Sequence, residues 1–541
     1  MRTTTKACLQ CRQGKRRCDG SLGTTCTPCN KRGLSCSSAT RVKAGTALKP
    51  AEPSLRPSSD VRDVRCTPGS SAGSQEDTLA LTDQETIIKL VELYIECIHD
   101  KPHTLFHVPT LRADVASRTI DKALLCSILA LSARFAATEK TRSLGPRFFV
   151  QTKRLLQQDL ETLSLSRIQA WVIAGNVAGA ESNSTSESLF FGIAIRSAHL
   201  VGLAQHSPED GTVLRETKSR IWWTLYMIDR WSSAGLGTPR QLERQEWQQL
   251  PLDEYNFHRL NVGQKHWDSP SKLGMWAYMI FLAEIFGPIT DLNHSIASGK
   301  ASQEHVSTHV AHLFSRLQKW QEDLPELLRL NVENLHFHKG RGQGRTFVAL
   351  HLGYFHYATL LSFHFLDQSS ASIPFATIYA ERCRQHASAY SDLLKTSYEL
   401  GECEGMHNIV GHMTVVSSSV LLHTLLFGAE EELDSAKRQL ESNFNILVRL
   451  KAWWPSVAQM TDRLFLFQRI CLRTVDNHTH KIDHWMVKFL LEHAILLEDK
   501  SDLSRLESTS PQEFASPELP ELNRLSERGR FTKNALSGLR A

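Results

Sequence analysis

Six of the twelve cysteines of this 541-residue chain fall within 29 residues near its N-terminus. They follow the spacing Cys-x2-Cys-x6-Cys-x7-Cys-x2-Cys-x6-Cys and are Cys8, Cys11, Cys18, Cys26, Cys29 and Cys36. The pattern has two near-equal halves, each a CxxC pair followed by a third cysteine. In a reducing compartment, thiols at such spacing bind metal rather than form disulfides. We therefore expect a metal site to determine how this stretch folds.

Zinc suits six thiolates at this spacing. Zn²⁺ takes four ligands in a tetrahedron, with each sulfur at about 2.3 Å. Six thiolates can therefore serve two ions only if two of the sulfurs bridge them. Zinc binding contributes roughly 10–16 kcal/mol in finger-sized peptides, where it is also the folding free energy. Because this stretch has almost no apolar core, we expect two Zn²⁺ per chain and an unfolded apo module.

Two other arrangements of the cysteines compete with the two-zinc cluster. One is a six-cysteine disulfide knot, which has fifteen possible connectivities. The first residues contain no apolar stretch typical of a secretory signal, which argues against such a knot. The other is a four-cysteine site made by the two CxxC pairs, which leaves Cys18 and Cys36 unused.

Positive charge is concentrated around the same cysteines. Residues 1–50 carry eleven Lys and Arg against one acid, Asp19, whereas the remainder carries 51 basic and 56 acidic residues. A small basic module on an otherwise acidic protein is typical of binding to a polyanion. The basic residues between the second and third cysteines are Arg12, Lys15, Arg16 and Arg17.

The chain divides by composition into four parts. Residues 1–45 form the cysteine module, and residues 46–84 are rich in Ser, Thr, Pro, Gly and Ala, which predicts a disordered linker. No heptad seam follows the module, so we expect no coiled coil there. Residues 85–498 are predicted to form a large helical domain. Residues 499–541 form a polar tail whose mixture of acidic and apolar residues makes it a candidate activation segment.

The large domain is predicted to be all-α, because apolar residues recur at helical spacing and strand-like alternation is scarce. The clearest helical stretches are 121–137, 186–203, 213–232, 272–286, 306–330, 345–366, 375–398, 407–427, 434–453 and 482–498. The longest uninterrupted apolar run, Met275 to Ala283, falls short of the ~20 residues of a membrane span. We therefore expect no membrane association.

The cysteine module resembles the Zn2Cys6 DNA-binding domain of fungal transcription factors. The matching residues are Ala7-Cys8-x2-Cys11-Arg12-x2-Lys15-x-Arg17-Cys18-Asp19-Gly20 and Cys26-x2-Cys29-x-Lys31-x-Gly33-x2-Cys36. The resemblance implies that Cys8 and Cys26 bridge the two zinc ions. It also implies that the helix after Cys11 enters the major groove of double-stranded DNA. There Lys15 would contact a CGG-type triplet, with Arg12, Arg16 and Arg17 reaching phosphates or flanking bases.

This chain departs from the family pattern at a few positions. Position 14, which is usually basic in the family, is Gly14, and glycine weakens a short helix by up to about 1 kcal/mol relative to alanine. The proline common before the fourth cysteine is replaced by Thr25, and Pro28 stands within the second CxxC instead. These differences affect which triplet is read rather than the metal ligands.

Residues 186–252 resemble the middle homology region, the regulatory domain of the same family. The matching residues are Phe191-Gly192-Ile193-Ala194-Ile195-Arg196, Ala198-His199, Gly202-Leu203, Arg220-x-Trp222-Trp223-x-Leu225-Tyr226-x-Ile228-Asp229-Arg230, Gly237-x-Pro239 and Leu250-Pro251. The resemblance extends over about 85–300. It implies a nuclear, sequence-specific regulator of RNA polymerase II genes that works with the transcription machinery or coactivators. A small-molecule effector at the helical domain and a homodimer are further partners that it allows.

Residues in the helical domain that could carry chemistry have simpler structural interpretations. Trp222, Trp223 and Tyr226 are expected to be core aromatics rather than the wall of a ligand cavity. Asp229 and Arg230 are expected to form a structural ion pair. Histidines cluster at 336–338, 351–364 and 478–484, and glycines cluster at 339–345. None of these clusters matches a catalytic or phosphate-binding pattern. We therefore expect no catalytic residues and no enzyme activity.

Two other classes of function compete with gene regulation. One is an enzyme whose zinc module only targets it, with the helical domain as catalyst. The other is a chromatin or corepressor scaffold that uses DNA contact for positioning.

Overall fold

The computed structural model describes part of the cysteine module and most of the helical domain. Within the module it describes Cys11, residues 18–19 and residues 26–32. Beyond the module it describes 77–476 apart from 102, 206, 208, 245–247, 265–272 and 367–374. The chain forms two compact units, Met1–Ser74 and Gln75–Ala541. The helix predicted at 482–498 and the tail predicted at 499–541 lie outside the described residues.

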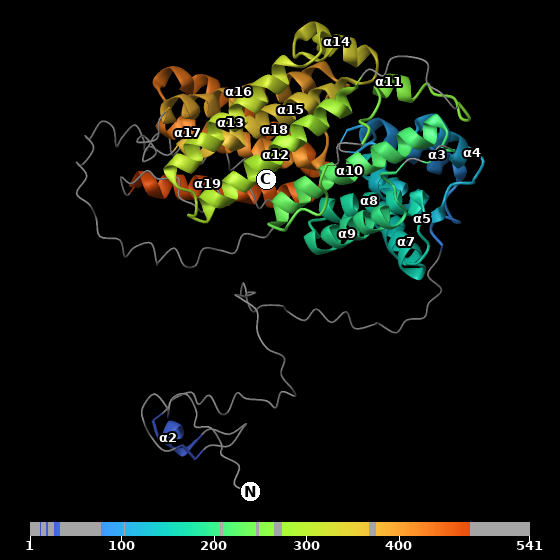
Figure 1. Ribbon diagram of the computed structural model, residues 1–541, viewed down its shortest axis with the longest axis horizontal. Helices are drawn as coiled ribbons and strands as arrows, with labels where there is room; N and C mark the ends of the chain where they lie inside the picture. Colours follow the sequence, from blue (N-terminus) through green and yellow to red (C-terminus); the bar gives the residue numbers. More distant parts are fainter. Residues whose placement is uncertain are drawn as a thin grey trace. The chain divides into compact units, whose positions relative to one another are not determined.

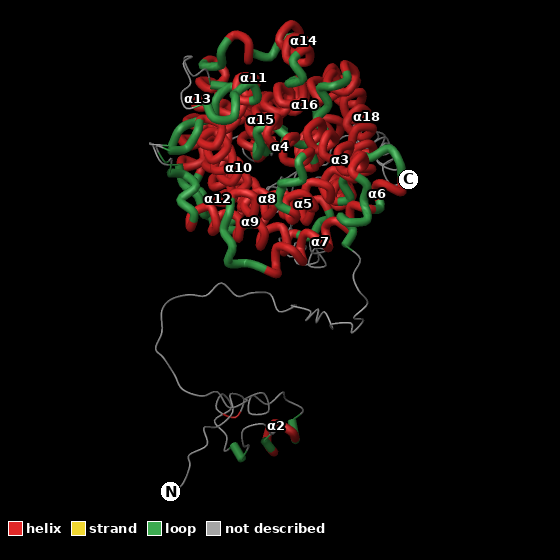
Figure 2. The backbone as a smooth tube through the Cα atoms, turned by 90° about the vertical axis from the view of Figure 1, so that its right-hand side faces the viewer, coloured by secondary structure: helices red, strands yellow, loops and turns green. Residues whose placement is uncertain are grey.

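The described part of the chain consists of helices joined by loops, which confirms the all-α prediction (Figure 2). Within it, β pairing is limited to isolated bridges, His99 with His103 and Leu252 with Leu273. In the first unit the one complete helix described is α2 (Thr27–Asn30).

The second unit begins with seven longer helices. These are α3 (Gln84–Cys97), α4 (Val108–Ala116), α5 (Lys122–Ser132), α7 (Leu144–Gln158), α8 (Leu165–Ala180), α9 (Ser184–Leu200) and α10 (Thr212–Leu236). Two short turns of helix, η1 (Ala133–Phe135) and α6 (Glu139–Arg142), lie between them, and a third, α11 (Glu254–Phe257), follows α10. Asp83, Asp121, Ser164 and Asn183 each cap a helix by accepting a hydrogen bond from a backbone N–H three residues later. Such caps satisfy N–H groups that a helix leaves unpaired at its start.

Eight longer helices follow in the described part of the unit. They are α12 (Met275–Ala297), α13 (Gln303–Glu322), α14 (Val332–Gly340), α15 (Gly344–Ser362), α16 (Ala376–Leu400), α17 (Asn408–Phe427), α18 (Glu430–Trp453) and α19 (Ser456–Asp476). Two 3-10 turns, η2 (Glu326–Leu328) and η3 (Phe363–Leu366), lie among them.

These helices pack around one continuous apolar core (Figure 1). In the earlier half α5 packs against α3, α7 and α8, and α8 packs against α9. In the later half α15 packs against α12 and α16, and α17 packs against α16, α18 and α19. Helix α10 joins the halves because it packs against both α9 and α12. Residues at the starts of α17 and α19 line one cavity together with residues of α8, α9 and α10.

Two helices of the core are long and apolar enough to cross a membrane. They are α12 and α17, and 72% and 94% of their most apolar windows are buried inside the domain. Every residue of α17 from Val410 to Leu426 is buried. Such burial is what the central helices of a large helical domain require.

The predicted helical stretches that fall on described residues agree with the structure, and the differences have local causes. The stretch 306–330 is not one helix, because α13 ends at Glu322 and Pro325 precedes the separate turn η2. The predicted stretches do not include α7 or α8. The residues of α8 are buried on several sides, which leaves no single apolar stripe, whereas α7 is amphipathic and buries one face. Residues 77–83 lie within the predicted linker but are ordered. Their Leu79 N–H donates to Gln151 Oε1 at 3.2 Å, and Thr78 is buried.

Candidate metal centre and nucleic-acid interface

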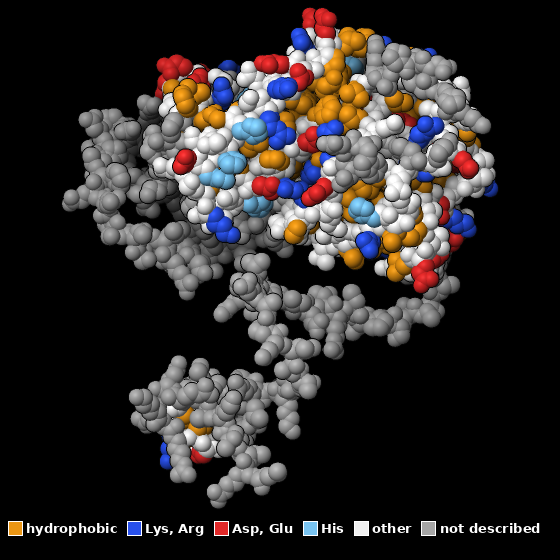
Figure 3. All heavy atoms as spheres, viewed as in Figure 1, with side chains coloured by type: hydrophobic (Ala, Val, Ile, Leu, Met, Phe, Trp, Pro, Cys, Tyr) orange, Lys and Arg blue, Asp and Glu red, His pale blue; other side chains and the backbone are white. Residues whose placement is uncertain are grey.

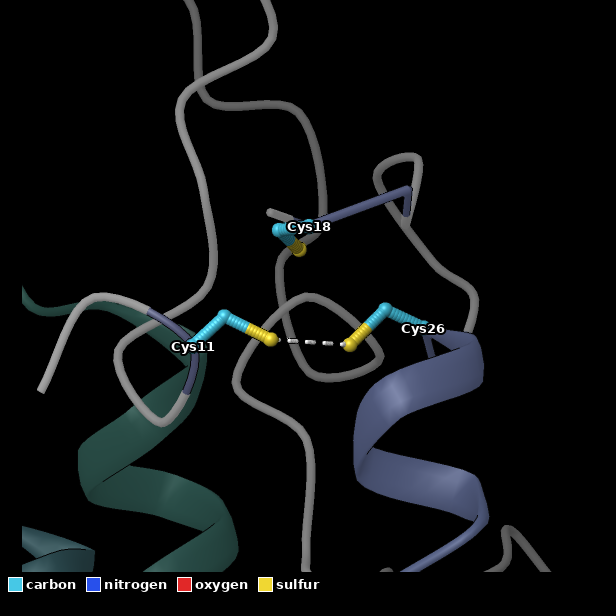
Figure 4. Close-up of side chains that lie close together, drawn as sticks. All are labelled: Cys11, Cys18 and Cys26. Carbon is cyan, nitrogen blue, oxygen red and sulfur yellow. Dashed lines mark hydrogen bonds between the residues drawn. The ribbon is translucent and has the colours of Figure 1, made fainter. Parts of the chain in front are cut away.

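Three of the predicted zinc ligands converge in the first unit. Cys11, Cys18 and Cys26 direct their sulfurs toward one another (Figure 4), and all three sulfurs lie within 4.8 Å of one another. The sulfurs of Cys11 and Cys26 are 3.5 Å apart. A disulfide would bring them to about 2.05 Å, whereas two sulfurs on one tetrahedral zinc lie about 3.8 Å apart. The observed separation therefore fits a shared metal ion.

Helix α2 positions two cysteines at its start. Cys26 is the N-cap residue and Cys29 lies one turn later, where its N–H donates to the Cys26 carbonyl at 3.1 Å. Both cysteines are 1% exposed. Pro28 occupies the first turn, where its missing N–H costs nothing. This accounts for a proline within the second CxxC.

Asp19 ties the two halves of the module together. Its Oδ1 accepts a hydrogen bond of 2.9 Å from the N–H of Thr27, the first residue of α2. Hydrogen bonds from the side chain and then the backbone of Thr27 lower the pKa of Asp19 below its ordinary value. The negative charge also stands at the positive end of the helix dipole. The sequence indicates this capping role of Asp19 only by its position, since it is an acidic residue directly after the third cysteine, Cys18.

Other predicted site residues lie outside the described residues: Cys8 and Cys36 among the metal ligands, and Arg12, Lys15, Arg16 and Arg17 among the DNA contacts. Lys31 and Arg32 are described and are exposed directly after α2. On the face of the helical domain drawn in Figure 3, by contrast, basic and acidic side chains are intermingled. That face carries no extended basic stripe of the kind that binds a nucleic-acid backbone.

A buried ion pair organises the segment around Arg220. The Arg220 side chain is 0% exposed, and its Nε donates to Glu216 Oε1 at 2.8 Å. It also donates to the Leu252 carbonyl at 2.6 Å and to Thr104 Oγ1 at 3.1 Å. The bonds to Leu252 and Thr104 join α10 to neighbouring loops, and the bond to Glu216 lies within α10, so the role of Arg220 is structural.

The aromatic and charged residues that follow Arg220 are also structural. Trp222, Trp223 and Tyr226 are 5%, 0% and 2% exposed and belong to the core. Asp229 and Arg230 do not pair with each other but fix one loop. The Asp229 carboxylate accepts from the N–H of Leu242 at 2.9 Å, and Arg230 donates to the Leu242 carbonyl at 3.1 Å. The expected ion pair is therefore replaced by two bonds to the same residue.

His99, Asp100 and His258 form a second set of side chains with metal-ligand chemistry. Asp100 Oδ2 lies 2.7 Å from His258 Nε2 and 3.3 Å from His99 Nδ1. The Phe106 N–H donates to His99 Nε2 at 3.1 Å, so the proton of the neutral ring is on Nδ1. That proton faces Asp100 and blocks Nδ1 as a ligand. The arrangement is a hydrogen-bonded network that holds the loop before α4.

Two family models match the chain. Residues 6–45 match the fungal Zn(2)-Cys(6) binuclear cluster domain. Residues 91–322 match the fungal specific transcription factor domain. The two matches cover the converging cysteines and the Arg220 segment respectively.

Curated relatives carry related descriptions. The chain is 23% identical to the Zn(2)-C6 fungal-type transcription factor FTF2 of Fusarium oxysporum f. sp. lycopersici, over 72% of this chain and 40% of that protein. Another, FTF1c of the same organism, is 23% identical over 77% of this chain and 49% of its own length. A transcriptional regulatory protein of Schizosaccharomyces pombe is 22% identical over 50% of this chain and 32% of its length. The matched region thus spans between about a third and a half of these relatives.

Proposed function

We propose that this chain, which belongs to the fungal Zn(2)-Cys(6) transcription factors, is a sequence-specific DNA-binding regulator of RNA polymerase II genes that acts in the nucleus. The observation that carries the proposal is the convergence of Cys11, Cys18 and Cys26 within 4.8 Å in the most basic part of the chain. Thiolates brought together in a basic module suit a metal-stabilised fold that meets a polyanion.

The proposed metal centre holds two zinc ions on six thiolates. Its ligands are Cys8, Cys11, Cys18, Cys26, Cys29 and Cys36, with Cys8 and Cys26 as bridges. Bound zinc supplies the folding free energy of the module. The burial of Cys26 and Cys29, at 1% exposure each, supports a site closed to water.

DNA reading is assigned to the segment after Cys11. Lys15 donates to guanine O6 and N7 of a CGG-type triplet, which distinguishes G·C from other pairs in the major groove. Arg12, Arg16 and Arg17 contact phosphates or flanking bases. The exposed Lys31 and Arg32 after α2 add positive charge to the same module. Phosphate contacts make the affinity depend on salt without adding sequence information.

The helical domain transmits regulation in this proposal. Its partners are the transcription machinery or coactivators, a small-molecule effector and a second copy of the chain. The domain can serve as a rigid scaffold because the described core runs through α3 to α19 without interruption.

The proposal is tested with Lys15→Ala, with Arg41→Ala, which lies after the last cysteine of the module, as its matched control. On a CGG-containing duplex Lys15→Ala should lose about 1–3 kcal/mol of binding free energy, with little change on a scrambled duplex. Arg41→Ala should weaken both duplexes alike and reduce the salt slope by about one unit if it contacts phosphate. Equal losses on both duplexes for Lys15→Ala would move base reading to another residue.

Zinc content checks the metal centre in the same samples. The full chain should contain two zinc ions, and Cys18→Ser should lose zinc and DNA binding together. Cys97→Ser, in the buried core of the helical domain, should keep both. One zinc per wild-type chain would refute the binuclear cluster.

A further inference from the structure

A small cavity lies where the two halves of the helical domain meet. Its volume is about 90 Å³, and it is bounded by α8, α9 and α10 on one side and by the starts of α17 and α19 on the other. The polar residues that line it are Asn176, Ser182, Ser184, Glu187, Ser232, His407, Asn408, Ser456 and Gln459. The rings of Phe191 and Trp231 supply part of the apolar wall.

Two polar atoms of the lining are buried without a hydrogen-bond partner. They are Ser456 Oγ and His407 Nδ1, and Ser456 is 5% exposed. Nearly all buried polar atoms in folded proteins have a partner, so such exceptions call for one. Both atoms belong to residues that line the same cavity, which is where a bound group could supply the missing bonds.

Glu187 adds a carboxylate with no counter-charge. It is half-buried in the first turns of α9, and burial alone raises its pKa to about 7. The carboxylate rests against Gly179 of α8, where an added Cβ would lie 2.8 Å from Oε1 and 3.0 Å from Oε2. The absence of a side chain at Gly179 therefore leaves the space that Glu187 occupies.

The charges around Glu187 favour a cation in this cavity. Of the described residues that line it, only Glu187 and His407 can titrate. Burial, assisted by the nearby Arg134, lowers the pKa of His407 to about 3, so His407 is neutral. Arg134 itself pairs with Glu181 at 3.4 Å. The lining thus offers one negative charge and no positive one.

A neighbouring cavity has the opposite character. Its volume is about 70 Å³, and it shares the walls formed by Trp231, His407 and Ile409. Lys101, Arg345 and Glu404 line it, together with several apolar residues, and Arg345 pairs with Glu404 at 2.9 Å, so Lys101 leaves one positive charge in excess. A cation is therefore favoured in the cavity beside Glu187 and disfavoured in the neighbouring cavity that Lys101 lines.

We propose that the cavity beside Glu187 binds a small organic cation, an ammonium group on a short apolar chain. Glu187 is the counter-ion, Ser456 Oγ and His407 Nδ1 accept hydrogen bonds from the ammonium, and Trp231 offers its ring to the cation. The volume limits the buried part to a few heavy atoms, since a cavity of about 150 Å³ holds benzene. This inference assigns a chemical class to the small-molecule effector of the proposed function, and it rests on that part of the proposal alone.

The test is calorimetric titration of the full chain, without DNA, using n-propylammonium chloride at pH 8. Propionate and 1-propanol serve as matched probes of opposite and zero charge, and potassium chloride as the inorganic cation. We expect binding of the ammonium alone. Because the titration contains no DNA, a failure of the DNA-reading proposal leaves its outcome unchanged.

Three variants locate the site. Glu187→Gln should weaken ammonium binding at least tenfold, because it removes the counter-ion and keeps the shape. Gly179→Ala should weaken it as well, because the new methyl group displaces the Glu187 carboxylate. Glu441→Gln, an exposed substitution on α18, should bind as the wild type does. Glu187→Gln should fold at least as stably as the wild type, since it removes an uncompensated charge.

Several results would overturn the inference. Wild-type protein that releases no heat with propylammonium lacks the site. Equal affinity in Glu187→Gln and the wild type moves any binding elsewhere. Binding of propionate or propanol as tight as that of the ammonium contradicts the assigned charge, and equal competition by potassium contradicts an organic ligand.

Discussion

Replacing Arg220 with alanine should destabilise the helical domain by about 3–5 kcal/mol. The substitution leaves Glu216, whose side chain is 8% exposed, without its partner at 2.8 Å. It also removes the donor to the Leu252 carbonyl and the guanidinium that stacks 4.3 Å from the Phe257 ring. Breaking one side of a buried pair is costly because the remaining charge has neither water nor a counter-ion.

The expected shift can be stated as a melting temperature. A domain of roughly 400 residues has an unfolding entropy of about 0.8 kcal/mol/K. A loss of about 4 kcal/mol should therefore lower the Tm by about 5 °C. The exposed pair of Arg112 with Glu92, at 2.7 Å with side chains 53% and 44% exposed, is the matched control. Arg112→Ala should cost less than about 1 kcal/mol and shift the Tm by about 1 °C or less.

The loss should also depend on pH, with a definite sign. Burial already raises the pKa of Glu216, and Arg220 opposes that rise. Without Arg220 the folded-state pKa moves further up, while unfolded Glu216 still loses its proton near its ordinary value. Stability of the variant then falls as the pH rises between these two values. The Tm difference between wild type and Arg220→Ala should be larger at pH 7.5 than at pH 5.

Circular dichroism at 222 nm during thermal unfolding measures these shifts. A double variant, Glu216→Leu with Arg220→Met, removes both charges and should recover most of the lost stability. If Arg220→Ala and Arg112→Ala shift the Tm equally, the buried pair contributes nothing beyond a surface pair. A double variant as unstable as the single one would show that packing, rather than the unpaired charge, causes the loss.

Three further perturbations have defined outcomes. Chelation of zinc from the full chain should abolish DNA binding but leave most of the helical signal at 222 nm. The signal should remain because none of the proposed zinc ligands belongs to the described core of the helical domain. Loss of the helical signal together with DNA binding would contradict this expectation. Asp19→Ala should lower the affinity for zinc roughly tenfold in a chelator competition, as for residues that orient metal ligands. The contribution of Asp19, whose pKa is lowered, is present at neutral pH and lost as the pH falls through the folded-state pKa. Deletion of 499–541 should reduce reporter output, and unchanged output would exclude an activating tail.

The features that the sequence predicted best are those set by local rules. Six cysteines at fixed spacing can satisfy tetrahedral zinc in few ways, so three sulfurs within 4.8 Å agree with the pattern. Amphipathic helices such as α13 and α18 show their apolar stripes directly. Helices buried on several sides, such as α8, have no stripe to detect. The break after Glu322 was missed because the apolar spacing continues past Pro325.

The features that the sequence did not predict depend on residues far apart in the chain. His258 is brought to Asp100 across 158 positions, and Arg220 to Thr104 across 116. Neither partner carries a local signal, since residues of the same types lie both at the surface and in the core elsewhere in the described part of the chain. The cavity beside Glu187 likewise needs residues from five helices and the residue before α17. Only the packed structure can bring such groups together.

The helical domain satisfies its buried polar groups closely in one region and leaves them unsatisfied in another. Around α10, Asp229 accepts from the N–H groups of Gln241 and Leu242, and Arg220 has acceptors on three sides. Beside α9, Glu187 has no counter-charge and Ser456 Oγ has no partner. Buried polar groups with hydrogen-bond partners stabilise the fold. Buried polar groups without partners destabilise it unless a bound ligand supplies the missing interactions. If the residues beside α9 served only the stability of the fold, Glu187→Gln would change neither the stability of the chain nor its binding of ammonium. A variant that stabilises the apo chain while abolishing ammonium binding would show that Glu187 serves binding at the expense of stability.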